Sequence, residues 1–128
     1  MAFAILYLGE GFKKTIETGM GNSDPLILKF FITVLSRIYN LDKKKFRYEL
    51  HLRADQNPVA LKRYWSKQLG IPVSHFKYAS IDKRTKGTRT YPEYKGVCLI
   101  RCSNVAIQRK SVYLSRKFCE KVINESRA

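Results

Sequence analysis

The spacing of apolar residues predicts two helices in the first third of the chain. Residues 3–8 form an apolar run of helical character, and Asp24 followed by Pro25 is typical of a helix start. This second helix should end near Asn40. Its apolar positions recur every three or four residues and should form one broad stripe against a core: Leu26, Ile27, Phe30, Phe31, Val34, Leu35 and Ile38.

Residues 45–53 change to a period of two, which is typical of a strand with one face on the core and one in solvent. The inward set is Phe46, Tyr48, Leu50 and Leu52, and the outward set is Arg47, Glu49, His51 and Arg53. The exposed face of this strand is therefore expected to be polar and mostly basic.

A third helix is predicted between Asn57-Pro58 and Gly70, residues that favour a helix start and a helix end. Residues 76–81 and 96–102 have strand character, and a basic, turn-rich segment connects them. The third helix should bury Leu61, Tyr64, Trp65 and Leu69.

A last helix is predicted from about Asn104 to Ile123, with Val105, Val112 and Cys119 on its inner side. No internal repeat and no linker interrupts the order of elements. We therefore expect residues 1–128 to form a single domain, which is long enough to bury one core.

Composition narrows the class of protein. The hydrophobic fraction of 45% is ordinary for a globular protein. No window approaches the roughly 18 apolar residues of a membrane span, and the N-terminus does not resemble a signal peptide. Cysteine is present at three positions, Cys98, Cys102 and Cys119, with no histidine close by in sequence. We expect a cytoplasmic protein with buried, reduced cysteines, and a zinc or redox site is the less favoured alternative.

The formal net charge of +15 is concentrated in the middle of the chain. Residues 1–42 are neutral, whereas residues 43–101 carry fifteen basic and four acidic side chains, a net of +11. This excess is larger than solubility requires and has few acids mixed into it, so nucleic acid is the expected partner. An anionic membrane fits less well because no basic amphipathic helix carries the charge.

The outward strand face and the basic connecting segment form the candidate nucleic-acid surface. A two-stranded ribbon fits a DNA major groove, where arginine contacts guanine edges or phosphates. A solvated sheet face beside a charged loop is the alternative. The candidate contacts are Lys45, Arg47, Arg53, Lys77, Lys83, Arg84, Lys86 and Arg89.

Outside the basic surface and the N-terminus, the sequence offers no pattern that is typical of a catalytic, nucleotide-binding or metal-binding site. His51 and His75 are isolated, and we expect neither to be catalytic. The chain has no Ser-His-Asp arrangement, no glycine-rich phosphate loop and no Cys-His metal spacing, which removes most hydrolase and nucleotide-binding classes. We expect no small-molecule cofactor.

The N-terminal nine-residue segment from Phe3 to Gly11 ends in Gly9-Glu10-Gly11 and resembles the LAGLIDADG motif. That motif is a helix that ends in a small residue, an acid and a glycine, and it occurs in homing endonucleases and in regulatory relatives that have lost cleavage. The resemblance implies an α+β fold with an N-terminal motif helix and a twisted, mostly antiparallel, saddle-shaped sheet. Helices would pack on one face of this sheet, and its basic strands would lie on DNA.

By this resemblance, Glu10 matches the metal-binding acid, and Gly9 the small residue where two motif helices approach. The family thus implies Mg²⁺ bound by Glu10 and Gly9, with Glu10 as the catalytic residue. Phosphodiester cleavage needs such an ion to neutralise the scissile phosphate and to activate water. Lys13 and Lys14 follow the acid and would offset charge near that phosphate, unless they belong to a solvated turn.

One motif supplies one acid, but cutting both strands of DNA requires two reaction centres. The endonuclease hypothesis therefore predicts a homodimer in which the N-terminal motif helices of two copies meet, with Ala4, Leu8 and Gly9 at the interface. Ile5 and Leu8 depart from the motif, which usually has a glycine and commonly an acid there. A DNA-binding or regulatory protein that does not cut remains the alternative, and RNA binding is a third.

Overall fold

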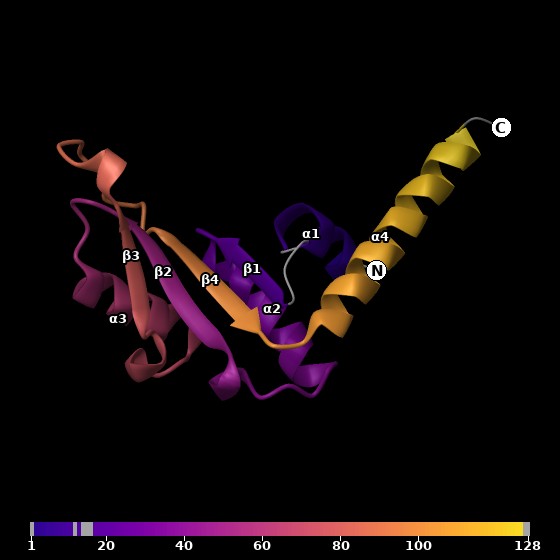
Figure 1. The fold of residues 1–128 in the computed structure, drawn as a ribbon, viewed down its shortest axis with the longest axis horizontal. Coiled ribbons are helices and arrows are strands. Elements are labelled where there is room, and N and C mark those ends of the chain that lie inside the picture. Colours follow the sequence, from indigo (N-terminus) through magenta and orange to yellow (C-terminus); the bar gives the residue numbers. More distant parts are fainter. Residues whose placement is uncertain (1, 12, 14–16, 127–128) are drawn as a thin grey trace.

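The computed structural model describes residues 2–11, 13 and 17–126, and the backbone alone at Val105. Over these residues the chain forms four α-helices and one four-stranded sheet, so the predicted α+β class is confirmed (Figure 1). The helices are α1 (Ala2–Glu10), α2 (Pro25–Arg37), α3 (Pro58–Leu69) and α4 (Val105–Ser126). The strands are β1 (Thr18–Asn22), β2 (Arg47–Arg53), β3 (Tyr78–Asp82) and β4 (Val97–Cys102), and short 3-10 turns are η1 (Lys43–Lys45), η2 (Val73–His75) and η3 (Lys83–Thr85).

The sheet has the strand order β1-β4-β2-β3. Strand β4 lies between β1 and β2 and is antiparallel to both, whereas β3 joins the edge of β2 in parallel. The parallel pair is possible because α3 carries the chain back to the start of the sheet before β3 begins. In the register of β2 and β4, Arg47 faces Arg101 and His51 faces Val97.

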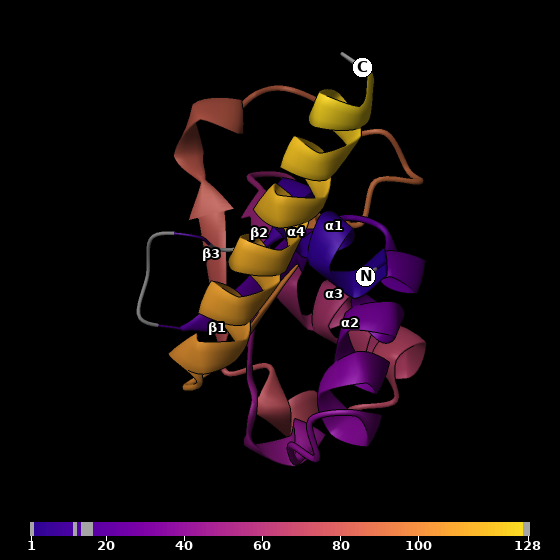
Figure 2. The same cartoon turned by 90° about the vertical axis from the view of Figure 1, so that its right-hand side faces the viewer.

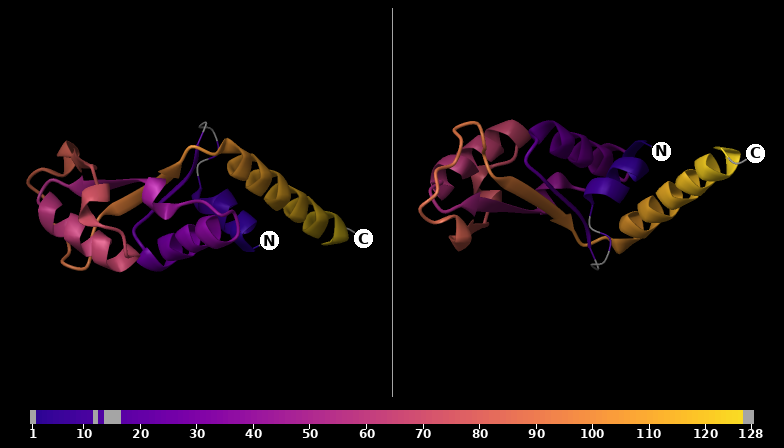
Figure 3. Two further views of the ribbon diagram at one scale, coloured as in Figure 1. Left: turned by 90° about the horizontal axis from the view of Figure 1, so that it is seen from below. Right: turned by 90° about the horizontal axis from the view of Figure 1, so that it is seen from above.

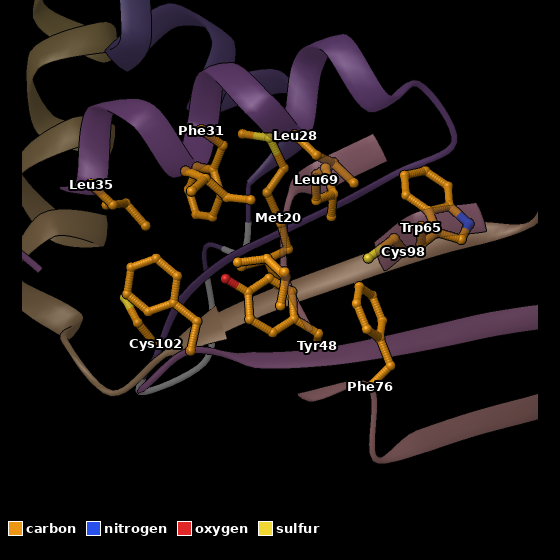
Figure 4. Packing of buried hydrophobic residues seen from close by; sticks show 14 of the residues in the cluster. Met20, Leu28, Phe31, Leu35, Tyr48, Trp65, Leu69, Phe76, Cys98 and Cys102 are labelled. Carbon is orange, nitrogen blue, oxygen red and sulfur yellow. The ribbon is translucent and has the colours of Figure 1, made fainter. Parts of the chain in front are cut away.

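Helices α2 and α3 cover one side of the sheet and leave the other side open (Figure 3). The core lies between these helices and the sheet, as Figure 4 shows from close by. Strands β2 and β4 contribute Tyr48, Leu50, Leu52, Cys98 and Ile100, and α3 contributes Trp65 and Leu69. The inward set predicted for β2 is confirmed.

The predicted caps of α2 and α3 are also confirmed. Asp24 accepts a hydrogen bond from the backbone N–H of Leu26 at 2.9 Å, and Asn57 accepts one from Val59 at 2.9 Å. Gly70 ends α3 with a φ of 67°, a left-handed conformation that favours glycine.

The apolar stripe predicted for α2 is partly wrong. Leu26, in the first turn of α2, and Ile38, the residue that caps its C-terminus, are 71% and 73% exposed. The face that packs on the core instead includes Leu28 and Ile32, which were not among the residues of the predicted stripe.

Strand β1 was not predicted, since its glycine-rich sequence has no alternation of apolar and polar residues. It pairs with β4 along its whole length, and Met20 also bridges Gly11 in antiparallel fashion. The end of α1 is therefore joined to β1 by an antiparallel bridge.

Helix α4 packs along α1 and then continues past the body of the protein (Figures 1 and 2). Small or polar side chains are buried on both helices, Ala4 on α1 and Ser111 and Ser115 on α4, and they allow a close approach. The predicted inner side of α4 is confirmed in part, because Val112 packs against the core, but the fully buried residues of this face are Ile107, Gln108, Ser111 and Ser115. Val112 and Cys119 are only partly buried, and the Val105 side chain lies outside the described residues.

The three cysteines are free, and Cys98 and Cys102 are buried as expected while Cys119 is partly exposed. Burial raises the pKa of the Cys98 thiol, so this residue remains a neutral apolar group. None of the described helices is both long enough and apolar enough to cross a bilayer.

Candidate functional site

Glu10 is the last residue of α1 and its side chain is exposed. The side-chain amide of Asn22, at the end of β1, donates a hydrogen bond of 3.0 Å to Oε2 of Glu10. Asn22 in turn accepts a hydrogen bond of 2.8 Å from the backbone N–H of Asp24. The carboxylate is thereby fixed at the junction of α1, β1 and α2.

The two glycines beside Glu10 have different surroundings. A Cβ atom on Gly11 would lie 2.5 Å from the Tyr7 ring, so only glycine fits beneath this ring. The Tyr7 hydroxyl accepts a hydrogen bond of 3.1 Å from the backbone N–H of Gly19, which ties the end of α1 to β1. A Cβ atom on Gly9 would meet nothing within 4 Å, and this residue lies open on the helix surface.

Lys13 has a structural role at the same helix end. Its ammonium group donates hydrogen bonds to the carbonyl oxygens of Leu8 at 2.8 Å and Gly11 at 3.0 Å. Carbonyls in the last turn of a helix lack intrahelical partners, and a cation also suits the negative end of the helix dipole. The ammonium group of Lys13 is therefore engaged by the backbone, rather than solvated in a turn or free to contact a phosphate. Lys14 lies outside the described residues.

The donors at this helix end suit a hard cation but do not complete its coordination. Glu10 has a carboxylate whose Oε1 accepts no hydrogen bond from the described residues, and the Gly9 carbonyl belongs to the last turn of α1. Within the described part of the chain, no three His, Cys, Asp or Glu residues form a metal-binding group. Mg²⁺ is commonly bound by one or two carboxylates together with phosphate oxygens and water, so a ligand would have to supply the remaining positions.

The face of the sheet that bears no helix carries paired charges. Arg47 on β2 and Arg101 on β4 are neighbours in register, and both contact the carboxylate of Glu17, Arg101 at 3.9 Å. Arg101 also lies 3.5 Å from Glu49. The expectation that few acids mix with this basic face is therefore wrong, because Glu17 comes from a distant part of the chain.

Arg53 holds the basic loop, which we define as residues 83–92, against the end of β2. Its guanidinium donates hydrogen bonds to Thr90 at 2.9 Å and Thr88 at 2.6 Å. Asp55 accepts hydrogen bonds from the backbone N–H of Thr90 at 2.8 Å and from its hydroxyl. These bonds lower the pKa of Asp55, and the charge of Arg53 acts in the same direction. Arg53 is thus a loop-positioning residue rather than a free cation.

The remaining predicted cations separate into two groups at opposite ends of β2. Arg84 forms an ion pair with Asp82 at 3.0 Å, but Lys83, Lys86 and Arg89 of the basic loop are exposed and form no ion pair with a described carboxylate. At the other end, Lys45 and Lys77 precede β2 and β3 and line a pocket of about 160 Å³, which we call the basic pocket. Its polar lining comprises Lys44, Lys45, Arg47, His75, Lys77 and Tyr78.

The separation of the two groups follows from strand geometry. Strand β2 has seven residues, and at about 3.3 Å per residue its ends lie roughly 20 Å apart. The single basic strip expected from the sequence is therefore divided into two cationic ends with a charge-balanced face between them.

The predicted dimer-interface residues are distributed over two sides of α1. Ala4 is 4% exposed and belongs to the core of this chain, so its placement at an interface is wrong. Leu8 is partly buried, whereas Gly9 is exposed. The outward side of α1 is formed by Ala2, Ile5 and Gly9, which recur at three- and four-residue spacing, and Ile5 is 37% exposed.

Sequence reasoning missed Glu17, Arg101, Lys44 and Tyr78 as parts of this surface. Lys44 and Tyr78 adjoin predicted residues, but a period of two assigns each of them to the face opposite its predicted neighbour, Lys45 or Lys77, and so could not have found them. No local pattern indicates that Glu17 contacts Arg47.

Comparison with known protein families, with curated proteins and with solved structures found no match.

Proposed function

We propose that the chain is a DNA-binding protein of the LAGLIDADG type that cuts double-stranded DNA as a Mg²⁺-dependent homodimer. One observation carries this proposal. Glu10 presents an exposed carboxylate at the end of a packed N-terminal helix, and Gly11 beneath the Tyr7 ring turns the chain from this helix toward the sheet. The same sheet has an open face with cations at both ends.

The two cationic ends support DNA as the ligand. Phosphate contacts orient a protein on a duplex, whereas groups between them contact base edges. A major groove about 12 Å wide fits between cationic groups roughly 20 Å apart. His51 and Ser80 face each other in register on the open side of the sheet, and their polar side chains would lie above the groove.

The homodimer would form along the outward side of α1. Gly9 permits a second helix to approach closely, because no atom lies within 4 Å of the position of a Cβ. Ile5 and Leu8 would flank it. A two-fold axis along this helix would bring two Glu10 carboxylates together at the DNA.

Glu10 and the Gly9 carbonyl would hold Mg²⁺ together with DNA phosphate oxygens. The ion would supply a Lewis acid for the scissile phosphate and an activated water. The role of Asn22 is to hold the Glu10 carboxylate in a fixed position at the end of β1.

A DNA-binding protein that does not cut is the second candidate. Exposed Ile5 favours it, because a branched side chain at this position keeps a second helix farther from α1 than glycine would. In that case Glu10 would join the end of α1 to the end of β1 through its hydrogen bond with Asn22, and it would bind no metal.

The test is incubation of the protein with a randomised duplex library, with and without Mg²⁺, beside Glu10→Gln. We expect Mg²⁺-dependent cuts that this variant loses while its DNA affinity persists. Glu120→Gln on α4 is the matched control and should cut like the wild type, since Glu120 lies on an exposed surface.

Binding without cuts under all conditions would support the second candidate. Absence of DNA binding at low salt would refute both. Sedimentation of the protein alone and with DNA tests the dimer, and a monomer in both states would contradict the two-strand cut.

A further inference from the structure

The basic pocket has unpaired positive charge. Lys44, Lys45 and Lys77 line it, and none of them forms an ion pair with a carboxylate of the described residues. Arg47 also lines it, but its guanidinium contacts Glu17. The lysines are therefore the groups that would neutralise an anion, and lysine acts toward phosphate as a compact point charge.

The pocket also contains a polar atom without a partner. His75 lines it, and Nδ1 of this imidazole is buried with no hydrogen bond to the described residues. A buried nitrogen of this kind is usually paired. An anion in the pocket would give it one.

The floor of the pocket is neutral and rigid. Phe46 and Tyr48 form it, and both are buried. The Tyr48 hydroxyl donates a hydrogen bond of 2.7 Å to the carbonyl of Lys43, which ties η1, the turn that carries Lys44 and Lys45, to β2. Burial raises the pKa of Tyr48, so no phenolate competes with an incoming anion.

An aromatic ring lies at the rim. Tyr78 begins β3, lines the pocket and is 66% exposed. A nucleic-acid base can stack on such a ring when its phosphate is held nearby by cations.

We propose that the basic pocket binds a phosphate group of a nucleic-acid strand, with the adjacent base stacked on Tyr78. The identity of the strand rests on the proposed function, but affinity for phosphate does not. The same chemistry would accept free phosphate, and the experiment separates the two sources.

The first arm uses inorganic phosphate, with sodium chloride at equal ionic strength as the reference. Amide chemical shifts should change at residues 44–48 and 75–78. The double variant K45Q/K77Q should weaken this binding about tenfold, because two charge-assisted contacts are lost. The control K29Q/K67Q removes the same charge from exposed positions on α2 and α3 and should bind like the wild type.

The second arm uses thymidine 5′-monophosphate. Tyr78→Ala should weaken nucleotide binding several-fold and leave inorganic phosphate binding unchanged, and Tyr78→Phe should restore it. Equal affinity of Tyr78→Ala and the wild type for the nucleotide would restrict the pocket to free phosphate and overturn the nucleic-acid assignment. Far-ultraviolet circular dichroism verifies that each variant is folded.

The third arm measures duplex DNA affinity and its salt dependence. The slope of log affinity against log salt should fall by about one in K45Q/K77Q, because the pocket neutralises one phosphate. If DNA binds K45Q/K77Q and K29Q/K67Q equally, the pocket is not on the DNA path and this inference fails while the proposed function stands. If phosphate binds in the pocket but DNA does not bind the protein, the proposed function fails and the phosphate site remains.

Discussion

Asn22 holds the carboxylate of Glu10 through a hydrogen bond of 3.0 Å between the end of β1 and the end of α1. The two residues are twelve positions apart in sequence, and the bond joins the helix that carries the acid to the sheet that would carry DNA. The position of the acid therefore depends on β1 as well as on α1.

Asn22→Ala should reduce Mg²⁺-dependent cleavage about tenfold while DNA affinity stays near the wild-type value, because a displaced catalytic group costs rate rather than binding. Single-turnover nicking and fluorescence anisotropy provide the two measurements. The adjacent, exposed Ser23→Ala is the control. A parallel loss of affinity and rate would show that Asn22 supports the fold rather than the position of Glu10.

Gly11→Ala should destabilise the protein by about 1–3 kcal/mol, because the added methyl group overlaps the Tyr7 ring. Gly9→Ala has space and should change the free energy of unfolding by less than about 1 kcal/mol. Urea denaturation of the two variants tests the difference. Equal stabilities would mean that Tyr7 moves aside without cost.

Arg53→Ala should loosen the basic loop, because the hydrogen bonds to Thr88 and Thr90 are lost. We expect a loss of about 1–2 kcal/mol in the free energy of unfolding and faster amide hydrogen exchange at Thr90. Arg53→Lys should not restore the loop, because lysine lacks the planar fork that reaches two threonines. Arg89→Ala, which changes an exposed side chain, should leave exchange unaltered and reduce the salt slope of DNA binding by about one.

The contact between Asp55 and Thr90 should make the loop sensitive to acid. The hydroxyl and the backbone N–H of Thr90 lower the folded-state pKa of Asp55 below its unfolded value of about 4. The stabilisation is then complete above the unfolded pKa and disappears as the pH falls through the lower, folded one.

Urea midpoints of the wild type and Asp55→Asn, measured from pH 7 to pH 2, test this dependence. The difference between the two proteins should be constant near neutrality and decrease in the acid range. A difference that does not change with pH would show that the Asp55 charge has no part in fixing the loop.

Local patterns were sufficient for most of the secondary structure. Asp24 and Asn57 are caps that act within three residues of sequence, and the alternation in β2 reflects burial of one face, so both could be predicted. Strand β1 could not, because Gly19 and Gly21 give it no hydrophobic period and its pairing with β4 spans some eighty residues. Tertiary pairing alone makes this segment a strand.

The surface was predicted less completely than the fold. Lys45 and Lys77 were both predicted to lie on the candidate surface, but sequence spacing did not indicate that they meet in one pocket with His75. Arg47 and Arg53 lie on the predicted strand, yet Glu17 and the loop threonines occupy their guanidinium groups. Such partners come from distant segments, whose approach depends on the folded sheet.

The anchoring of the basic loop by Arg53 and Asp55 has a thermodynamic consequence. The backbone of the loop is already anchored in the free protein, so association with a polyanion requires little additional ordering of this backbone. Binding should then lack the large negative heat-capacity change that accompanies folding of a segment on its ligand. Its free energy should come mainly from counterions released into solution, and it should weaken steeply with salt while varying little with temperature.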